Sequence, residues 1–316
     1  MWFKGHIKAE GKIAVISGAS QGLGAEIAKQ LFEKGASVYL VARNEASLKQ
    51  KVEEIEKVRV NETQIVDYVR ADLTKYSDAS NVFEVIGKSP DIVMCCAGSS
   101  KPGYFLKMTE KDLETGVNIN YNTAMNFAHC ALNKMCTSNK TLQEEPRHLV
   151  FFSSIVGFYP FIGYGQYAPM KTAIKTLSDV LRQECLPYNI SVDCVFPGNF
   201  ESAGFIEEEL TKPKITREIE GPSEVIPASA CAKIVIDQLD QGYQYVTTDL
   251  IGWILSCLSL GYSPRCLGLP QLFFAIILST FGGFLQAYYN YSIRSFIKTN
   301  PLPHEISDIA KDDKAK

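Results

Sequence analysis

Residues 12–24 read KIAVISGASQGLG, an apolar run that passes directly into a glycine-rich turn. The run has the length and composition of a buried strand, and the amphipathic stretch after it, to about Gly35, has the pattern of a helix. A glycine-rich turn at the start of a helix brings free backbone N–H groups close to a ligand. This stretch therefore predicts a strand, a turn and a helix that together bind a pyrophosphate.

Each glycine of this G-x-x-x-G-x-G turn has a predicted role. Gly18 permits the tight turn, Gly22 lets a phosphate approach the backbone, and Gly24 packs the helix against the strand. The residues between these glycines are predicted to line the same cofactor site: Ser20, Gln21 and Leu23. A purely structural turn has a similar sequence, so the glycines alone leave both interpretations open.

The alternation of apolar run and amphipathic stretch continues to about residue 245. Further strands are predicted at 37–41, 64–69, 91–96, 148–153, 190–196 and 243–248. Most of these runs are continuously apolar, as strands buried on both faces of a parallel sheet are. The fold predicted for residues 1–248 is therefore α/β, a Rossmann-type doubly wound, mostly parallel seven-stranded sheet.

Composition excludes several classes of protein. The 316 residues include 32 Lys+Arg and 35 Asp+Glu, a net charge of −3, so no basic footprint for nucleic acid is present. The hydrophobic fraction of 46% excludes a disordered chain. The nine cysteines form no C-x-x-C pair and the four histidines are scattered, which argues against a disulfide framework and against a metal site.

Residues that follow the second and third predicted strands indicate which nucleotide is bound. Arg43 stands where an acidic residue would accept hydrogen bonds from the 2′-OH of NAD, and its guanidinium suits a 2′-phosphate, so NADPH is predicted. A solvated arginine at a helix start is the alternative. Asp72, followed by Leu73, could accept from the adenine amine or simply cap a helix.

The strongest chemical signal is Ser154 with Tyr167 and Lys171. The i, i+4 spacing places Tyr167 and Lys171 on one helical face, and Ser154 precedes Tyr167 by 13 residues. A phenol is a poor acid at neutral pH, and a neighbouring ammonium group lowers its pKa. The three residues therefore predict a ketone reductase in which Ser154 holds the carbonyl oxygen and Tyr167 donates the proton.

With these motifs in order, the chain resembles the short-chain dehydrogenase/reductase family over about residues 10–248. The resemblance implies that Tyr167 is the general acid, that Lys171 also binds the cofactor ribose, and that Asn120 holds a water for proton relay. It further implies cofactor contacts from Gly98, Pro197, Gly198, Tyr167 and Lys171. One departure is Cys95-Cys96, where the family has asparagines that brace the sheet.

Within that family the chain is most similar to the fungal 3-ketosphinganine reductases. The similar stretches include YPFIGYGQYAPMKTAIK (159–175), PGNFES (197–202) and the loop that begins with TKPKIT (211–216). This resemblance implies NADPH-dependent reduction of a long-chain sphingoid ketone at the endoplasmic reticulum membrane, with the catalytic domain in the cytosol. Two alternatives are a membrane-anchored reductase of another lipid ketone, 3-ketoacyl or steroid, and a non-catalytic cofactor-binding scaffold.

The stretch 199–227 is predicted to cover the substrate. Its apolar residues alternate with acidic ones, a pattern that suits an apolar chain or a bilayer surface. An ordinary lid that packs on its own core is an equal alternative.

The C-terminal part is predicted to associate with membrane lipid over 249–298 and to end in a polar tail, 299–316. The best span is 267–289, which is 23 residues, about 35 Å as a helix. A single span, a re-entrant hairpin and a monotopic attachment are all open, and a buried core helix is the alternative to them. Family analogy also suggests a homo-oligomer that pairs through the helices predicted at 109–136 and 164–188.

Overall fold

The computed structural model describes residues 7–136, 146–221, 224–259 and 268–299. Seven parallel strands form one sheet in the order β3-β2-β1-β4-β5-β6-β7. The strands are β1 (Ile13–Ser17), β2 (Ser37–Ala42), β3 (Val66–Arg70), β4 (Ile92–Cys95), β5 (Arg147–Phe152), β6 (Ile190–Phe196) and β7 (Tyr245–Thr247). The predicted doubly wound seven-stranded sheet is therefore confirmed.

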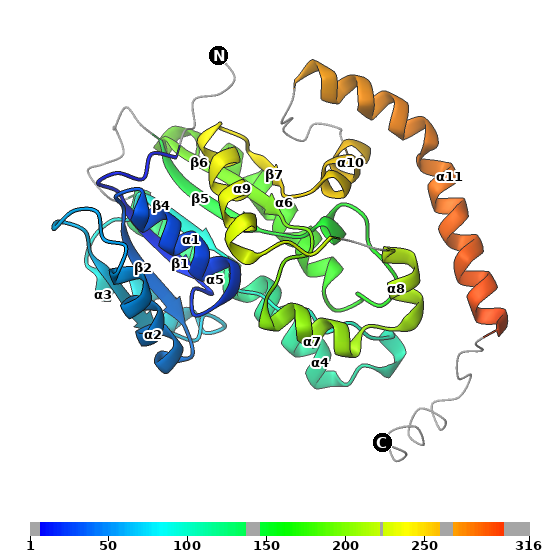
Figure 1. Ribbon diagram of the computed structural model, residues 1–316, viewed down its shortest axis with the longest axis horizontal. Coiled ribbons are helices and arrows are strands. Elements are labelled where there is room, and N and C mark those ends of the chain that lie inside the picture. The colour runs from blue at the N-terminus through cyan, green and yellow to red at the C-terminus, as the bar shows by residue number, and fades with distance from the viewer. Residues whose placement is uncertain (1–6, 137–145, 222–223, 260–267, 300–316) are drawn as a thin grey trace.

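Two layers of helices cover the sheet (Figure 1). One face carries α1 (Gly22–Glu33), α2 (Glu45–Glu56) and α9 (Ala228–Asp240), and the other carries α3 (Tyr76–Ile86), α5 (Thr123–Cys136) and α6 (Ala168–Glu184). Side chains of each strand alternate between the two cores: Ala14 and Ile16 pack on the α1 side, and Val15 on the α5 side. Burial on both faces explains why these strands are continuously apolar.

The predicted helix at 109–136 has an interruption. It consists of α4 (Glu110–Val117), one π turn, η2 (Asn118–Asn122), and then α5. Thr109 starts α4 with a capping box to Asp112. The pairing of copies through this segment and α6 stays a prediction.

Helices also form in the predicted substrate cover and after the sheet. The cover contains α7 (Ala203–Thr211) and α8 (Lys214–Glu220), and β7 is followed by α10 (Leu250–Leu258) and α11 (Leu269–Thr299). Helix α11 packs against α10 and touches α8, and it runs along the outside of the body (Figure 1).

The prediction that 267–289 spans a membrane is not supported. Within the parts of the chain that the structure describes, no helix combines the length and the apolar character that a bilayer crossing requires. Helix α10 has only nine residues, and Leu255 and Cys257 on it are buried. Apart from residue 299, the predicted polar tail lies outside the described residues.

Candidate active site

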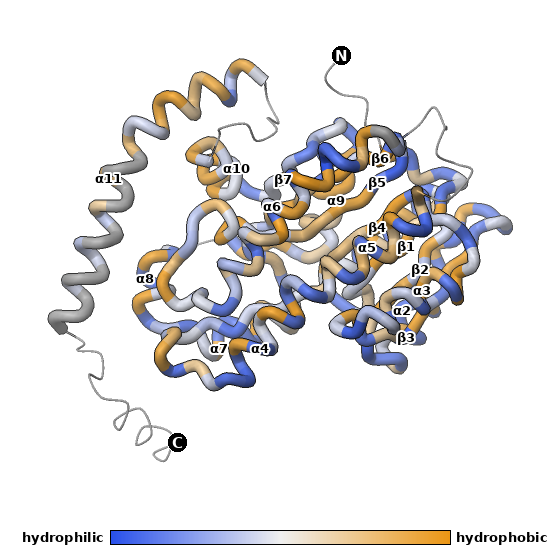
Figure 2. Tube along the Cα trace, turned by 180° about the vertical axis from the view of Figure 1, so that it is seen from behind, coloured by the Kyte–Doolittle hydropathy of each residue, from blue (hydrophilic) through white to orange (hydrophobic). Residues whose placement is uncertain are grey.

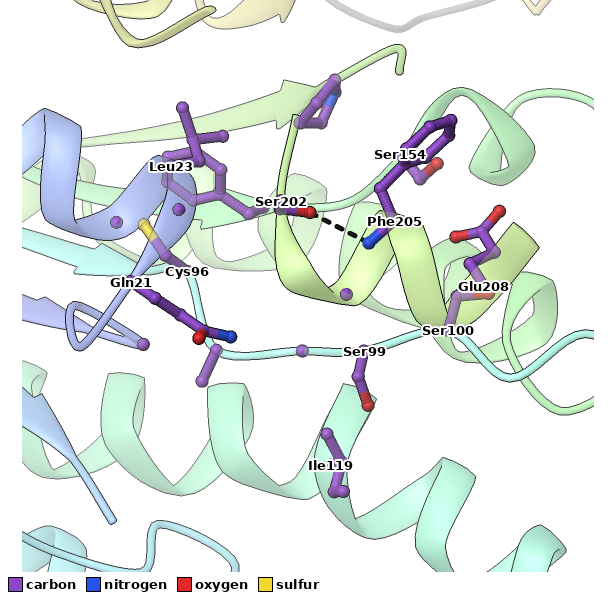
Figure 3. A pocket seen from close by; sticks show the side chains of 18 of the residues that line it. Gln21, Leu23, Cys96, Ser99, Ser100, Ile119, Ser154, Ser202, Phe205 and Glu208 are labelled. Atoms are coloured by element: carbon purple, nitrogen blue, oxygen red, sulfur yellow. Dashed lines mark hydrogen bonds between the residues drawn. The ribbon is translucent and has the colours of Figure 1, made fainter. Parts of the chain in front are cut away.

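A cleft of about 750 Å³ opens at the carboxyl ends of the strands, where β1 and β4 lie side by side and the strand order reverses. All of the predicted cofactor residues line it: Gly18, Ser20, Gln21, Gly22, Leu23, Gly24, Arg43, Asp72, Leu73, Gly98, Tyr167, Lys171, Pro197 and Gly198. Figure 3 shows Gln21, Leu23 and Cys96 at one end of this cleft and Ser154, Phe205 and Glu208 at the other. The cleft is thus long enough to hold a cofactor and a substrate end to end.

The glycine turn is built for close backbone approach. Gly18 has φ +68°, and a Cβ there would lie 2.9 Å from the Ala97 backbone. A Cβ on Gly24 would lie 2.7 Å from the carbonyl oxygen of Gly18. Gln21, the N-cap of α1, makes no capping hydrogen bond with its side chain, so the first N–H groups of α1 are available to a phosphate. The residues present therefore fit the pyrophosphate of a dinucleotide.

The far end of the cleft carries the residues predicted to hold the adenosine. Arg43 is exposed, and within the described residues its guanidinium has no hydrogen bond or ion pair. It directly precedes Asn44, whose side chain caps α2 by accepting from the backbone N–H of Ser47. Asp72 accepts from the backbone N–H and hydroxyl of Thr74, so it shapes the turn after β3 while it lines the cleft.

The three residues predicted to carry the chemistry meet at one place. Ser154 follows β5, Tyr167 is the N-cap of α6, and Lys171 lies one turn further along that helix. The Ser154 hydroxyl lies near the Tyr167 phenol and lowers its pKa. The Lys171 ammonium lies 5.4 Å from the centre of the Tyr167 ring and donates to the carbonyl oxygen of Phe152 at 2.9 Å. A ketone oxygen in this corner can therefore reach two hydroxyl groups at once.

The acidity of the phenol differs from the prediction. Burial is the main influence on Tyr167 and raises its pKa, the charge of Glu208 raises that pKa further, and the nearby Ser154 hydroxyl lowers it. Burial also lowers the pKa of Lys171 to about 8. The Tyr167 pKa is therefore raised on balance, whereas the neighbouring ammonium alone was expected to lower it.

Asn120 lies directly behind the cleft rather than on its wall. It is buried in the π turn, and its side-chain oxygen accepts from the backbone N–H of Ser99 at 3.0 Å. A Cβ on Gly98 would lie 3.1 Å from that oxygen and 3.1 Å from the Lys171 nitrogen. Gly98 thus keeps open the space that Asn120 and Lys171 both border. The π turn that carries Asn120 is of a kind that is frequent at functional sites.

The cleft also has residues that the sequence interpretation missed. Glu208 on α7 lines the substrate end and accepts a hydrogen bond from the Tyr164 hydroxyl at 2.5 Å. The sequence contains a signal for Glu208, the run of glutamates at 207–209. Such a run is typical of a solvent-exposed helix face, so it did not indicate a binding site. Thr248 accepts from the backbone N–H of Gly198 at 2.9 Å and holds the loop after β6.

Ser17 takes over part of the bracing that the family's asparagines provide. Its hydroxyl donates to the Met94 carbonyl at 3.3 Å and accepts from the Ala97 backbone N–H at 3.3 Å. It therefore ties the end of β1 to the end of β4. The neighbouring thiols of Cys95 and Cys96 have pKa values raised by burial.

The fold and this cleft define a nicotinamide-dependent oxidoreductase. The short chain dehydrogenase family model matches residues 12–212, and the chain belongs to that family. The fold agrees with a short-chain dehydrogenase from Sphingobium yanoikuyae solved in complex with NADPH, with a TM-score of 0.65 at 22% identity over 76% of this chain and 88% of that one. A short-chain dehydrogenase/reductase from Burkholderia phymatum, solved in complex with NAD, has a TM-score of 0.65 at 18% identity over 82% of this chain and 98% of that one.

Curated relatives narrow the class further. The chain is 42% identical to a 3-ketodihydrosphingosine reductase of Debaryomyces hansenii, over 98% of this chain and 97% of that protein. It is 43% identical to the enzyme of the same name from Yarrowia lipolytica, over 92% of this chain and 79% of that protein. For the Saccharomyces cerevisiae enzyme of that name the identity is 36%, over 81% and 85%.

Proposed function

We propose that this protein reduces the 3-keto group of 3-ketosphinganine to the alcohol of sphinganine with NADPH, a step of sphingolipid biosynthesis. The observation that carries the proposal is the meeting of Ser154, Tyr167 and Lys171 in the cleft of a chain that matches a 3-ketodihydrosphingosine reductase along nearly its whole length. A non-catalytic scaffold would have no use for this set of residues.

The nicotinamide supplies a hydride to the carbonyl carbon when it is bound. The chain's own residues act on the carbonyl oxygen: Ser154 donates a hydrogen bond to it, and Tyr167 gives it the proton that completes the alcohol. Lys171, held by the Phe152 carbonyl, is placed to hydrogen bond to the cofactor ribose. Asn120, behind Gly98, is proposed to hold a water that returns a proton to the site.

The preference for NADPH rests on the adenosine end of the cleft. The guanidinium of Arg43 lines that end without a partner among the described side chains, and the Ser47 hydroxyl lines it too. The N-terminus of α2 begins between them at Glu45. Arginine, a hydroxyl and a helix start are together suited to a phosphate group on the ribose.

Contact with membrane lipid is part of the same proposal. Large apolar side chains are exposed on α10 and α11, which pack together, and on α7, among them Leu250 on α10 (69%), Phe273 on α11 (62%) and Leu210 on α7 (80%). Figure 2 shows the apolar character of α10 and of the first part of α11. The exposed apolar side chains of α10 and α11 suit a monotopic attachment, in which side chains enter one leaflet and no helix crosses it. The resemblance to fungal ketosphinganine reductases supports the cytosolic face of the endoplasmic reticulum as the place.

One experiment tests the reaction directly. The purified full chain is incubated in detergent with NADPH and 3-ketosphinganine, and the product is identified by mass spectrometry. Sphinganine formation supports the proposal. Turnover of a 3-ketoacyl or steroid ketone at least tenfold more efficiently, without sphinganine, refutes it. The attachment is tested by flotation with vesicles of neutral lipid, where protein that stays at the bottom contradicts a lipid-binding surface.

A further inference from the structure

A buried carboxylate lies close to the proton donor. Glu208 on α7 accepts a hydrogen bond from the Tyr164 hydroxyl at 2.5 Å. The centre of the Tyr164 ring is 6.0 Å from that of the Tyr167 ring. The two tyrosines and Glu208 all line the cleft, and Figure 3 shows Glu208 at the same end as Ser154. The carboxylate is thus separated from the reacting corner by one side chain.

The negative charge around Glu208 is only partly balanced. The buried ammonium of Lys212 is shared by three carboxylates, at 2.7 Å from Glu220 and 3.4 Å from Glu208, with Glu209 as the third. Of these, Glu208 and Glu220 line the cleft. Arg217 reaches Glu209 on the outer side. One buried lysine therefore faces two carboxylates that border the cleft, which leaves this wall negative.

Another polar group at this end lacks a partner. The Ser100 hydroxyl oxygen is buried and has no hydrogen bond within the described residues, and it lines the same cleft. Figure 3 shows Ser100 at the end where Glu208 lies. A buried hydroxyl without a partner costs stability unless a ligand satisfies it. The substrate end of the cleft is therefore equipped for a ligand with a cation and a further polar group.

We propose that Glu208 is a specificity-determining residue that binds an ammonium group on the carbon next to the reacting ketone. The inference rests on the proposed function, because 3-ketosphinganine carries an amine on C2 and a hydroxyl on C1, beside the C3 ketone. With the ketone oxygen on Ser154 and Tyr167, the ammonium lies on the Glu208 side and the terminal hydroxyl is available to Ser100. Lipid ketones without the amine leave this carboxylate unpaired.

Recognition of the amine also assists the chemistry. Burial is the main influence on Glu208 and raises its pKa, against the opposing effects of Tyr164 and Lys212. The charge of Glu208 in turn raises the pKa of Tyr167. An ammonium that neutralises this charge removes that effect, and the phenol becomes a better proton donor when the right substrate is present. Loss of Glu208 should therefore slow reduction of the amino ketone and should not slow reduction of a ketone without an amine.

The test compares two substrates in full-length protein: 3-ketosphinganine and 1-hydroxyoctadecan-3-one, which lacks the amine. The Glu208→Gln variant is expected to lose about 10- to 100-fold in kcat/KM for the amino ketone, the scale of one hydrogen bond to a charged group, and to change less than about threefold for the other ketone. Glu209→Gln is the matched control, since Glu209 also binds Lys212 but does not line the cleft. Glu209→Gln should behave as wild type on both substrates.

The outcomes separate the inference from the proposed function. Equal losses on both ketones, or no loss on the amino ketone, overturn the role of Glu208 while wild-type sphinganine formation stands. Failure of the wild type to form sphinganine overturns the proposed function and this inference with it. Glu208→Asp, which keeps the charge, should recover part of the preference for the amino ketone. A Glu208→Asp enzyme as indiscriminate as Glu208→Gln contradicts an electrostatic role.

Discussion

Replacement of Tyr167 by phenylalanine separates proton donation from every other role of this residue. The ring packs beside Val156, Tyr164 and Ala168, and phenylalanine keeps those contacts. The variant loses the hydroxyl that lies near Ser154, which should cost only about 1 kcal/mol of folding free energy. Turnover, in contrast, should fall by about 10²- to 10⁴-fold, the usual effect of a positioned acid.

The assay measures three quantities on the same preparation. Single-turnover oxidation of NADPH gives the chemical step, fluorescence titration gives the NADPH dissociation constant, and thermal unfolding gives stability. We expect the dissociation constant to change less than about threefold, because Lys171 and the glycine turn remain. Since burial and Glu208 raise the Tyr167 pKa, the wild-type phenol stays protonated through neutral pH. A Tyr167→Phe enzyme with more than a tenth of wild-type turnover would refute the assignment of the proton donor.

Three further perturbations test other parts of the site. Arg43→Ala should weaken NADPH binding at least tenfold and NADH binding little, since only the former carries the 2′-phosphate; equal weakening of both contradicts the assignment. Gly18→Ala should destabilise the fold by about 2 kcal/mol or more in urea unfolding, because φ is +68° and the Ala97 backbone lies 2.9 Å from the new Cβ; an unchanged midpoint would be inconsistent with this geometry. Lys171 has its pKa lowered to about 8 by burial, so between about pH 8 and the ordinary lysine pKa the unfolded chain holds more protons, and stability should rise with pH by up to about 3 kcal/mol. Lys171→Met should lack that rise, and a wild-type slope in the variant would assign it to another group.

The strands could be predicted from the sequence because the sheet is buried on both sides. Runs such as 190–196, largely apolar and rich in β-branched and aromatic residues, are typical of strands buried on both faces of a parallel sheet, and β6 occupies that range. The residues at which strands begin and end are harder to predict, because contacts of individual side chains decide them. The strand predicted at 64–69 begins only at Val66, because the Gln64 amide donates to the carbonyls of Phe32 and Ala36 and ends the preceding loop.

Spacing alone could bring together the residues of the site but not their electrostatics. The i, i+4 rule correctly placed Tyr167 and Lys171 on one face of α6. Where the lysine nitrogen comes to rest depends on the Phe152 carbonyl, at a sequence separation of 19, and no local pattern contains that contact. The same is true of Glu208, which reaches the site across 44 residues from Tyr164. The raised pKa of Tyr167 follows first from its burial and then from the charge of Glu208, and the local spacing contains neither.

Helix α7 unites the proposed recognition of the substrate head with the proposed contact to lipid. Residues two apart on a helix point to nearly opposite sides, and Glu208 lines the cleft while Ile206 and Leu210 are exposed, at 66% and 80%. The helix begins beside the phosphate turn, where the Ser202 hydroxyl accepts from the Phe205 backbone N–H (Figure 3). A charged wall inside and an apolar wall outside give an amphiphile one favourable orientation, with its head at Tyr167 and its chain toward the apolar exterior. Steroid and 3-ketoacyl ketones lack the cationic head that this orientation requires, and for that reason the charge on α7 favours the sphingoid ketone among the lipid ketones.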